Sequence, residues 1–366
     1  MTLTEIIVQK IKTEGIVSFY DFMEMALYYP NLGYYTSPRD KIGKQGDYYT
    51  SPSFTCLYGQ LIAKQLEEMW LLLGKKPFTV VEYGAGMGLL SLDILNQLKS
   101  NPQLYEQLNY FIIEKSEAMK KKEKTILNEK VTWYNSIQEI PKITGCILSN
   151  ELLDNFSIHQ VVMCDELMEV YVDYQDGFVE VLKPAPDELK DYLTELNVEL
   201  PKGFRTEINI QLIDWIKDLA ASLEQGFVLT IDYGFTSSEL YRQHRRLGTL
   251  TCYNNHKIND NPYQKVGDQD ITAHVNFSAL NHWGELNGLK CCGFTEQANF
   301  LRSLGLVEHL RKMEGQSNPS DSGTMNNMVL LHTLLMDMGT KFKVLIQQKG
   351  MQESKLSGLQ FSQKNC

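Results

Sequence analysis

The hydrophobic pattern changes its period most sharply between Phe78 and Asp93. An apolar, β-branched run at 78–81 is followed by three glycines at alternate positions, Gly84, Gly86 and Gly88, and then by leucines at helical spacing. This order predicts a buried strand, a tight turn and a helix. Glycines in the turn permit positive φ and let a ligand approach, while the new helix presents unpaired N–H groups to it.

The spacing of these glycines indicates which ligand binds. The dinucleotide fingerprint Gly-x-Gly-x-x-Gly would place its third glycine at Leu89, which disfavours a nicotinamide dehydrogenase. Glu82 lies two residues before Gly84, where its charge would repel a pyrophosphate but suits a cationic ligand without phosphate. S-adenosylmethionine is such a ligand. A glycine turn that only packs a helix against a strand is the alternative.

The remaining periodicity predicts an α/β protein with a parallel sheet. Helices are expected at 3–13, 18–27, 57–73, 116–127 and 208–223, and further strands at 110–113, 131–134, 146–149, 227–231, 291–294 and 342–346. A single long helix is expected between the glycine turn and the strand at 110–113. The run KKKEK at 120–124 is interpreted as a solvated helix face.

Two segments depart from this alternation and are interpreted as insertions. Residues 159–182 have period 2 around the hairpin turn Gln175-Asp176-Gly177, and residues 236–287 form a second excursion. The expected division is an N-terminal cap of helices and a tyrosine-rich loop at 1–76, core at 77–155, inserted hairpin at 156–205, core at 206–235, second insertion at 236–287, core at 288–349 and a flexible tail at 350–366.

Acidic residues follow several predicted strands, at the edge of the sheet where α/β proteins bind ligands. Glu114 follows the second strand and is predicted to accept hydrogen bonds from ribose hydroxyls, a solvated strand end being the alternative. Asn150, Glu151 and Asp154 follow the fourth strand, and Asp232 follows the fifth. The carboxylates after the fourth strand could hold a guanidinium or orient an amine. The alternative is that they favour a helix N-terminus.

The segment 28–54 contains six tyrosines and little apolar periodicity. Its length predicts a functional loop that excludes water, although simple aromatic packing is the alternative. His256, Asp270 and His274 lack the spacing of metal ligands, so we expect hydrogen-bonding roles and no metal. The candidate substrate or lid residues are Tyr34, Tyr35, Asp47, Tyr48, Asp232, Asp270 and His274.

Composition narrows the possible partners. With 35 basic and 45 acidic residues the formal charge is −10, which disfavours nonspecific binding to nucleic acid or anionic membranes. Seven scattered cysteines indicate a reducing compartment. No apolar run reaches the roughly 18 residues of a membrane span, and Glu5 and Glu14 make the N-terminus unlike a transit peptide. We therefore expect a cytoplasmic protein, or a mitochondrial matrix protein if the chain is eukaryotic.

Several blocks together resemble the MidA-like family, which includes the mitochondrial complex I assembly-factor arginine methyltransferase and bacterial relatives. The matching blocks are LGYYTS, GDYYTSP, EYGAGMG, FIIEKS, SNELLDNF, IDYG, GTLTCY, DITAHVNF and MGTKFKVL, and they span nearly the whole chain. Two positions depart from the family pattern. Ser53 stands where relatives usually carry Glu, and Ser157 where they usually carry Pro.

The resemblance implies a class I methyltransferase fold: a doubly wound, mostly parallel, Rossmann-like sheet of seven strands, the last antiparallel, with an inserted α+β substrate cap. It also implies S-adenosylmethionine binding and, for the mitochondrial member, methylation of an arginine on a complex I subunit. The cofactor residues implied are Glu82, Gly84, Gly86, Gly88 and Glu114, to which the strand-end position adds Asn150.

We therefore expect a methyltransferase acting on a protein side chain, arginine being favoured, with Glu151 and Asp154 as the catalytic acids. These acids would localise the guanidinium charge and leave one nitrogen to attack. The rival hypothesis is an assembly chaperone that keeps the fold without turnover. Loss of the glycines or of the strand-end acids would favour the chaperone, and none of them is lost.

Overall fold

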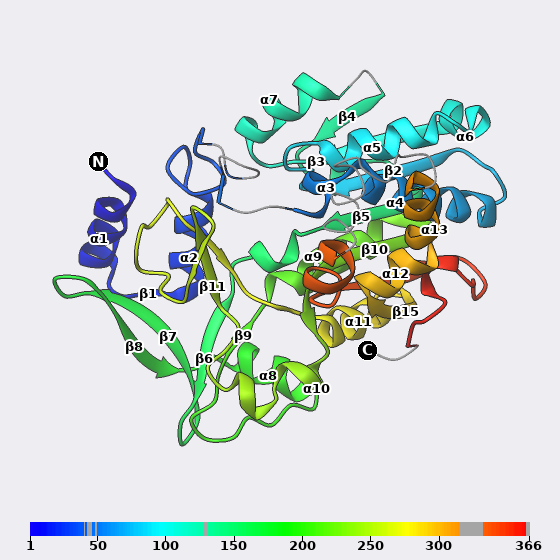
Figure 1. Ribbon diagram of the computed structural model, residues 1–366. Helices are drawn as coiled ribbons and strands as arrows, with labels where there is room; N and C mark the ends of the chain where they lie inside the picture. Colours follow the sequence, from blue (N-terminus) through cyan, green and yellow to red (C-terminus); the bar gives the residue numbers. More distant parts are fainter. Residues whose placement is uncertain (40, 42–45, 48–49, 128–129, 315–331, 364–366) are drawn as a thin grey trace. The chain divides into compact units, whose positions relative to one another are not determined.

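The computed structural model describes residues 1–39, 41, 46–47, 50–127, 130–314 and 332–363. The chain forms two compact units (Figure 1). The first contains Met1–Tyr49, Leu153–Trp215 and Phe235–His282, and the second contains Thr50–Leu152, Ile216–Gly234 and Trp283–Cys366. No helix among the described residues is long and apolar enough to span a membrane.

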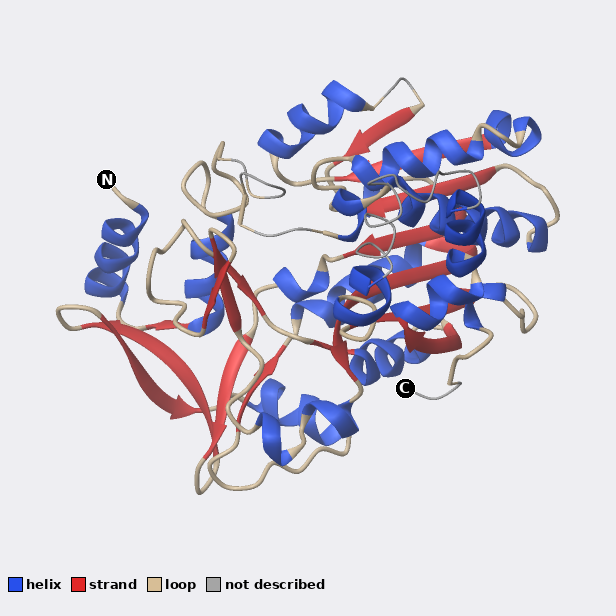
Figure 2. Cartoon of the chain, in the orientation of Figure 1, coloured by secondary structure: helices blue, strands red, loops and turns tan. Residues whose placement is uncertain are grey.

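The second unit is built on a mostly parallel sheet (Figure 2). The strands on the main path of this sheet are β2 (Phe78–Tyr83), β3 (Leu108–Ile113), β4 (Val131–Tyr134), β5 (Ile143–Asn150), β10 (Leu223–Phe235), β15 (Lys290–Glu296) and β16 (Phe342–Lys349). They follow the order β15-β16-β10-β5-β2-β3-β4. The strand β16 is antiparallel to both of its neighbours, whereas β10, β5, β2, β3 and β4 run parallel. The predicted α/β class and mostly parallel sheet are confirmed.

Helices connect these strands. They are α3 (Ser51–Phe54), α4 (Cys56–Leu72), α5 (Leu89–Leu98), α6 (Pro102–Gln107), α7 (Glu117–Ile126), α12 (Gln297–Ser303) and α13 (Leu306–Glu314), with short helices η1 (Ile137–Glu139), η4 (Thr333–Asp337) and η5 (Ser357–Leu359). The chain runs from β2 out to β3 and β4, then returns to β5 and β10 on the other side of β2. Since crossover connections are right-handed, this reversal places the helices of the two halves on opposite faces of the sheet.

The expected single helix between the glycine turn and β3 is wrong. Two helices, α5 and α6, occupy this connection because Pro102 begins a new helix that Asn101 caps. The Oδ1 of Asn101 accepts a hydrogen bond from the N–H of Leu104 at 3.2 Å. A proline at the first helical position and an Asn cap together form a strong start signal.

Helix α4 belongs to the core of the second unit, so the expected N-terminal segment 1–76 is too long. Side chains of α4, α5, α12 and α13 form one buried cluster with the strands, and Trp70 at 1% exposure and Phe300 at 0% lie within it. The central strands are almost continuously buried, as expected for parallel strands covered on both faces.

The first unit is antiparallel. One sheet has the order β1-β7-β6-β9, with β8 also pairing with β7. These strands are β1 (Val17–Ser18), β6 (His159–Met163), β7 (Leu167–Tyr174), β8 (Phe178–Pro184) and β9 (Arg205–Ile208). A second sheet contains β11 (Thr251–Asn254) between β12 (Lys257–Asn259) and β13 (Asp270–Thr272). The predicted hairpin turn at 175–177 is confirmed, because β7 pairs with β8 from Tyr174 and Phe178 onward.

Helices α1 (Leu3–Glu14), α2 (Phe19–Tyr28), α8 (Asp187–Glu195) and α10 (Ser237–Leu240), the short helices η2 (Leu153–Asn155) and η3 (Gln243–Arg245), and the strand β14 (Val275–Asn276) complete this unit. Helix α2 agrees with the helix expected at 18–27: Ser18 caps it, and its Oγ accepts from the N–H of Asp21 at 3.0 Å. Helices α9 (Gln211–Ser222) and α11 (Phe277–Leu286) each contain a boundary between the units.

The expectation of a flexible tail after 349 is wrong for the described residues to 363. Leu356 and Leu359 are 5% and 8% exposed within the core cluster. The N–H of Gly358 donates to Gln65, and Gln363 forms an isolated bridge with Phe294 of β15. Leu356 and Leu359, with partly buried Met351 against the same cluster, anchor this stretch.

Candidate functional site

The glycine turn between β2 and α5 has the predicted backbone. Gly84, Gly86 and Gly88 have φ of 63°, 59° and 74°, in the left-handed region that favours glycine. An added Cβ at Gly84 would lie 2.8 Å from the Cδ1 of Leu152. Gly88 directly precedes α5 and provides no side-chain cap, so the first turn of this helix presents backbone N–H groups at the end of β2.

Glu82 lies beneath this turn and is 2% exposed. Its Oε2 accepts hydrogen bonds from the hydroxyls of Ser91 and Tyr110, both at 2.5 Å. Burial raises the pKa of Glu82, and these two hydrogen bonds partly offset the rise. Its carboxyl group thus joins β2, β3 and α5 at the base of the glycine turn.

Glu114 directly follows β3 and is 9% exposed. Its Oε1 accepts from the N–H of Ser116 at 2.6 Å. Burial raises the pKa of Glu114 to about 7, although backbone hydrogen bonds and nearby lysines oppose the rise. A buried strand-end acid next to the glycine turn is the geometry that the sequence predicted.

The interpretation of residues 120–124 as a solvated face is wrong for Lys120 and Glu123, whereas Lys121 and Lys124 are exposed. Lys120 is 7% exposed and Glu123 is 0% exposed. The Oε2 of Glu123 accepts from the Nε1 of Trp133 at 2.6 Å. Glu123 follows Met119 and precedes Leu127 at intervals of four residues, and this helical spacing is the signal that could have identified it as buried.

The end of β5 carries Asn150 and Glu151 within a closed ring of hydrogen bonds. The hydroxyl of Tyr58 donates to the Oδ1 of Asn150 at 2.7 Å and lies 3.2 Å from the Oε1 of Gln297. The Nδ2 of Asn150 donates to the Oε1 of Glu151 at 3.3 Å, which also accepts from the N–H of Ser51 at 3.1 Å. The Nε2 of Gln297 donates to the Oγ of Ser51 at 3.4 Å and closes the ring.

Glu151 has a φ of 54°, an uncommon conformation for a residue with a side chain. Burial and, to a smaller extent, the charge of Asp232 raise the pKa of Glu151 to about 8, although the hydrogen bonds from Ser51 and Asn150 oppose the rise. The Oδ2 of Asp232 accepts from the N–H of Leu152 at 3.0 Å, so the acid that follows β10 supports the residue next to Glu151. Glu151 is followed by the short 3-10 helix η2 (Leu153–Asn155) and not by an α-helix. The alternative that Glu151 and Asp154 favour the N-terminus of an α-helix is therefore not supported.

The departure at Ser53 has a structural explanation. The Oγ of Ser53 accepts from the N–H of Thr50 at 3.0 Å, as the third helical residue of a capping box does. Ser157 is 0% exposed and donates to the Oε2 of Glu24 at 2.7 Å. Both serines are therefore hydrogen-bonded parts of the fold.

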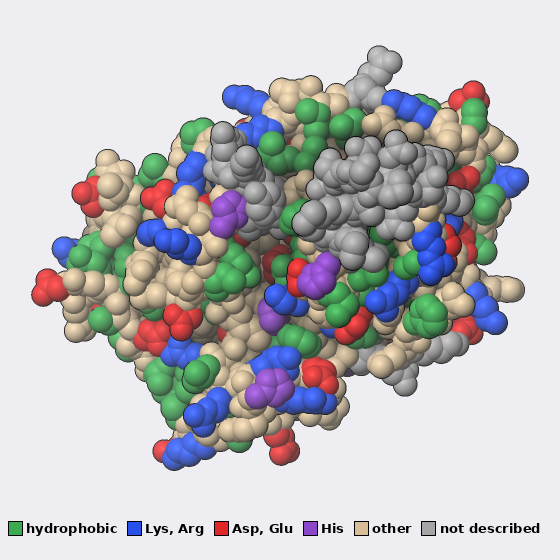
Figure 3. Space-filling view, viewed as in Figure 1, with side chains coloured by type: hydrophobic (Ala, Val, Ile, Leu, Met, Phe, Trp, Pro, Cys, Tyr) green, Lys and Arg blue, Asp and Glu red, His purple; other side chains and the backbone are tan. Residues whose placement is uncertain are grey.

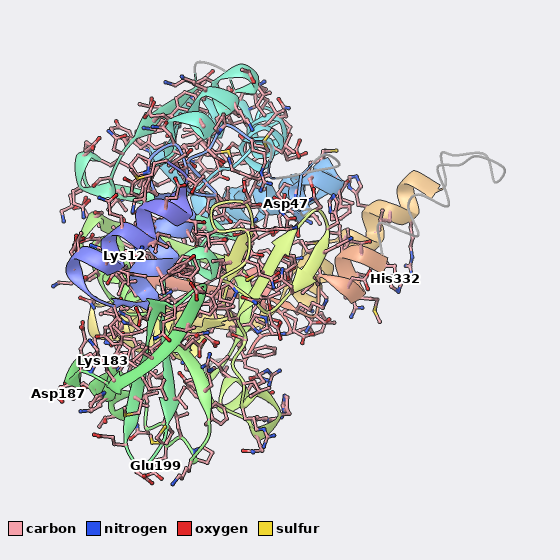
Figure 4. The ribbon with its side chains drawn as sticks, turned by 90° about the vertical axis from the view of Figure 1, so that its left-hand side faces the viewer. Lys12, Asp47, Lys183, Asp187, Glu199 and His332 are labelled. Carbon is pink, nitrogen blue, oxygen red and sulfur yellow. The ribbon has the colours of Figure 1, made fainter. Side chains whose placement is uncertain are left out.

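The tyrosine-rich segment of the first unit is tied to its three-stranded sheet. Asp47, labelled in Figure 4, accepts through Oδ2 from the hydroxyl of Tyr34 and from Arg39, both at 2.8 Å. Its Oδ1 accepts from the N–H of Asn255 at 2.6 Å. Tyr48 lies outside the described residues.

Tyr35 joins two acidic positions of the first unit. Its hydroxyl bonds to Asn155 and lies 2.9 Å from the Oδ1 of Asp270. The Nδ2 of Asn155 donates to the Oδ1 of Asp154 at 2.7 Å. Asp154 and Asp270 are 5% and 2% exposed, and burial raises the pKa of Asp270 to about 7.

His274 is positioned through its backbone. Its N–H donates to the Oγ1 of Thr249 at 3.0 Å, and this hydroxyl lies 3.0 Å from the Oε2 of buried Glu207. The ring of His274 lies 5.2 Å from that of Phe235. The backbone N–H of His256 donates to the carbonyl of Asp47 at 3.0 Å, and the role of its side chain stays a prediction.

The predicted residues thus fall into two groups. The glycines, Glu82, Glu114, Asn150, Glu151 and Asp232 lie at the carboxyl edge of the second unit's parallel sheet, whereas Tyr34, Tyr35, Asp47, Asp154, Asp270 and His274 belong to the first unit. The pairing of Glu151 with Asp154 stays a prediction.

The residues of the second unit fit S-adenosylmethionine. This cofactor carries a sulfonium and an ammonium group, both positive. The glycine turn offers backbone groups without side chains in the way, and Glu82 and Glu114 place acidic groups around it. The carboxylate of Glu114 suits a ligand with vicinal hydroxyls.

Comparisons with known proteins agree with this assignment. Residues 61–295, more than half of the chain, match a family described as "Putative S-adenosyl-L-methionine-dependent methyltransferase". "Protein arginine methyltransferase NDUFAF7 homolog, mitochondrial" of Drosophila melanogaster is 26% identical, over 93% of this chain and 84% of the relative. Its Caenorhabditis elegans counterpart is 28% identical, over 93% and 85%.

A solved structure extends the similarity to the whole fold. A COG1565 superfamily member from Burkholderia thailandensis, bound to S-adenosyl-homocysteine, is 27% identical with a TM-score of 0.88, covering 98% of this chain and 95% of that one. The family match, the relatives and the glycine turn lead to one conclusion. The chain belongs to this family of S-adenosyl-L-methionine-dependent methyltransferases.

Proposed function

We propose that this methyltransferase methylates an arginine side chain of a partner protein. The observation that carries the proposal is the geometry of Glu151. Among the described residues, both hydrogen bonds to its carboxylate engage Oε1, which leaves Oε2 for a ligand. The Drosophila melanogaster and Caenorhabditis elegans relatives are named protein arginine methyltransferases.

S-adenosylmethionine supplies an electrophilic methyl group when bound. A free arginine is protonated and a poor nucleophile. The ionised carboxylate of Glu151 would accept hydrogen bonds from the guanidinium, localise the positive charge on the bonded nitrogens and leave another nitrogen to attack. Asp232 adds negative charge beside Glu151, which favours a cationic substrate over a neutral one.

For the cofactor, we assign Gly84, Gly86 and Gly88 to the backbone cradle and Glu114 to the ribose hydroxyls. Glu82 supports the cradle from below through Ser91. Asn150 was predicted to bind the cofactor. Its side chain is engaged at both ends, by Tyr58 and Glu151, which favours a role in holding Glu151.

For the first unit, we propose a substrate cap that uses Tyr34, Tyr35, Asp47, Asp270 and His274, with Asp154 as a second acid. A protein partner accords with the net charge of −10 and with the acidic and basic side chains interspersed over the face drawn in Figure 3. Nucleic acid is disfavoured by the same charge. A role in complex I assembly and a cytoplasmic location stay predictions, and the curated relatives are named mitochondrial.

The experiment is labelling of cell extract from a deletion strain with radioactive S-adenosylmethionine, using the parent protein and Glu151→Gln. We expect a labelled protein whose methyl group is released as methylarginine on hydrolysis, and a strong loss with the variant. Labelling on lysine or another residue would reject the arginine assignment. If the parent labels nothing in any extract yet captures a partner, the chaperone hypothesis is correct.

A further inference from the structure

Three of the seven arginines in the chain lie within five consecutive positions of the first unit. They are Arg242, Arg245 and Arg246, and His244 stands among them. We call residues 242–247 the basic segment. Figure 3 shows basic side chains and a histidine gathered in the lower part of the view, near the place of α8 and α10 in Figure 1. This local gathering contrasts with the net charge of −10 of the whole chain.

One acid neutralises part of the charge of the basic segment. The Nη2 of Arg242 lies 2.5 Å from the Oε1 of Glu239, and the Nη1 of Arg245 lies 3.9 Å from its Oε2. Arg246 is exposed, and in the described parts of the chain its guanidinium forms no ion pair. Three guanidinium groups against one carboxylate leave this surface with a charge of +2.

Arg245 has a structural role that its two neighbours do not share. Its guanidinium carbon lies 3.8 Å from the centroid of the Phe235 ring, and its Nη1 donates to the carbonyl of Glu239 at 2.6 Å. The side chain of Arg245 is 19% exposed, whereas that of Arg242 is 56% exposed. Arg242 and Arg246 are therefore the arginines of this segment that a partner can reach.

The backbone of the basic segment is held in place from the inside of the unit. The N–H of Arg205 donates to the carbonyl of Arg246 at 2.9 Å, and Arg205 forms an isolated β-bridge with Leu247. Just after the segment, the buried carboxylate of Glu207 accepts the N–H of Thr249 at 3.0 Å. A surface that is ordered before binding loses little conformational entropy when a partner docks.

Leu247 adds an apolar side chain to this charged surface. It is 77% exposed, although its backbone is fixed by the bridge to Arg205. A single exposed leucine is common by itself. Here it directly follows Arg246, so a charged contact and an apolar contact are offered side by side on a fixed backbone.

The chemistry of the basic segment favours carboxylates. A guanidinium presents its donors as a planar fork that binds a carboxylate through two parallel hydrogen bonds, which the ammonium group of lysine does not do. A nucleic acid would spread its phosphates over more of the acidic chain than this segment covers. A short acidic protein segment meets mainly the local charge, because salt screens acids that are more than about 8 Å away.

We propose that residues 242–247 form a docking surface for an acidic segment of the protein that this enzyme methylates. Arg242 and Arg246 bind carboxylates of that segment, and Leu247 contacts an apolar side chain beside them. This inference rests on the proposed function, because it concerns the protein substrate. Glu151 belongs to the second unit, so this surface selects the partner through residues other than the one that accepts the methyl group.

The first test is fluorescence anisotropy of a labelled peptide in which Glu, Asp and Leu alternate, titrated with the full chain at about 50 mM and about 300 mM NaCl. The variants are Arg246→Glu, Arg242→Glu and Leu247→Ser. Their control is Lys12→Glu, which makes the same change of charge as the arginine variants at an exposed position of α1. Each arginine variant should bind roughly tenfold more weakly at low salt, and the control should stay within about twofold of the parent.

Leu247→Ser should also weaken the peptide, by roughly threefold at both salt concentrations, because an apolar contact is not screened. Equal affinities of the parent and Arg246→Glu would overturn the inference. Tighter binding of a single-stranded oligonucleotide of the same charge, weakened by the same variants, would also overturn it, since the surface would then serve nucleic acid.

The second test separates this inference from the proposed function. Deletion-strain extract is labelled with radioactive S-adenosylmethionine over a dilution series, with the parent and Arg246→Glu. The variant should need more extract for half-maximal labelling and reach the parental plateau, as expected for a raised KM at unchanged kcat. Parental labelling by the variant at every dilution would overturn the docking surface and leave arginine methylation in place. Methyllysine in place of methylarginine would reject the arginine assignment, whereas the shift between parent and variant would still support docking.

Discussion

The backbone N–H of Ser51 donates to the Oε1 of Glu151 at 3.1 Å, although the two residues are 100 positions apart. This bond fixes the start of α3 to the end of β5. It also helps to hold Glu151 at its positive φ, a conformation that persists only where surrounding contacts determine it. Glu151 is therefore positioned by two segments that are distant in sequence, the start of α3 and the end of β5.

Glu151→Gln should lower turnover without weakening the cofactor. The amide retains an oxygen for Ser51 and Asn150, but it loses the charge that would hold a guanidinium. A loss of roughly 3 kcal/mol in the barrier corresponds to about a hundredfold in kcat. Because the pKa of Glu151 is about 8 and its ionised form is needed, parent activity should rise with pH through about 8.

The variant should lack this rise, which a pH profile of kcat/KM measures. Titration with S-adenosylhomocysteine serves as the control, since its affinity should match that of the parent. A variant with parental turnover across the profile would remove Glu151 from the reaction.

Tyr58→Phe should destabilise the protein and misplace Glu151. The change removes one hydroxyl that serves both Asn150 and Gln297 in the buried ring. Leaving buried polar groups unsatisfied costs about 1–3 kcal/mol, to be measured by urea unfolding. Its control is Tyr105→Phe, a half-buried tyrosine of α6 outside the ring. A shift in the pH profile of the Tyr58 variant, absent from the control, distinguishes positioning from a general loss of stability.

Gly86→Val should abolish cofactor binding. A branched side chain enters the cradle and is strained at a φ of 59°. Gly74→Ala is the matched control, because Gly74 also has a positive φ of 78° but an added Cβ meets nothing within 4 Å. Calorimetry should show no heat for the first variant and parental affinity for the second. Parental affinity in a folded Gly86→Val protein would exclude the turn from the site.

Asp270→Asn should stabilise the protein at high pH. The pKa of Asp270 is about 7 in the folded protein and near 4 when unfolded. Between pH 4 and pH 7 the carboxyl of Asp270 is protonated in the folded state and ionised in the unfolded state. The free energy of unfolding therefore falls as the pH rises from 4 to 7. The neutral Asn avoids this loss, which amounts to as much as about 4 kcal/mol above pH 7.

Thermal unfolding at pH 4 and pH 8 measures the difference. The control is Asp268→Asn, an exposed acid two residues away, which should behave like the parent at both values. If the Asp270 variant loses more stability than the parent between pH 4 and pH 8, the pKa of Asp270 is not raised in the folded protein.

The sequence was sufficient to predict the elements for which the local residue preferences and the hydrophobic pattern favour the same structure. Strand β2, the glycine turn and the start of α5 follow from β-branched residues, glycines and leucines that each favour the observed backbone. The hairpin of β7 and β8 follows from period 2 and its Asp-Gly turn for the same reason.

The remainder depended on tertiary contacts that no local pattern contains. Glu123 lies in a run of lysines that is typical of solvated helices, yet it is fully buried and its carboxyl accepts a hydrogen bond from Trp133 of β4. The hydrogen-bonded ring joins residues from four separate segments, and a sequence does not indicate which of them meet. The polar segment after 349 is anchored by two leucines and a partly buried methionine, too few to produce a periodic signal.

The bridge between Gln363 and Phe294 has a consequence for handling the protein. Strand β15 lies at the edge of its sheet, and the unpaired backbone groups of an edge strand are a template for pairing with other chains. The N–H and carbonyl of Phe294 are both occupied by Gln363 at 2.9 Å. Truncation at 350 would uncover this edge together with the apolar surface under Leu356 and Leu359, and the shortened protein should aggregate during purification while the full chain stays dispersed.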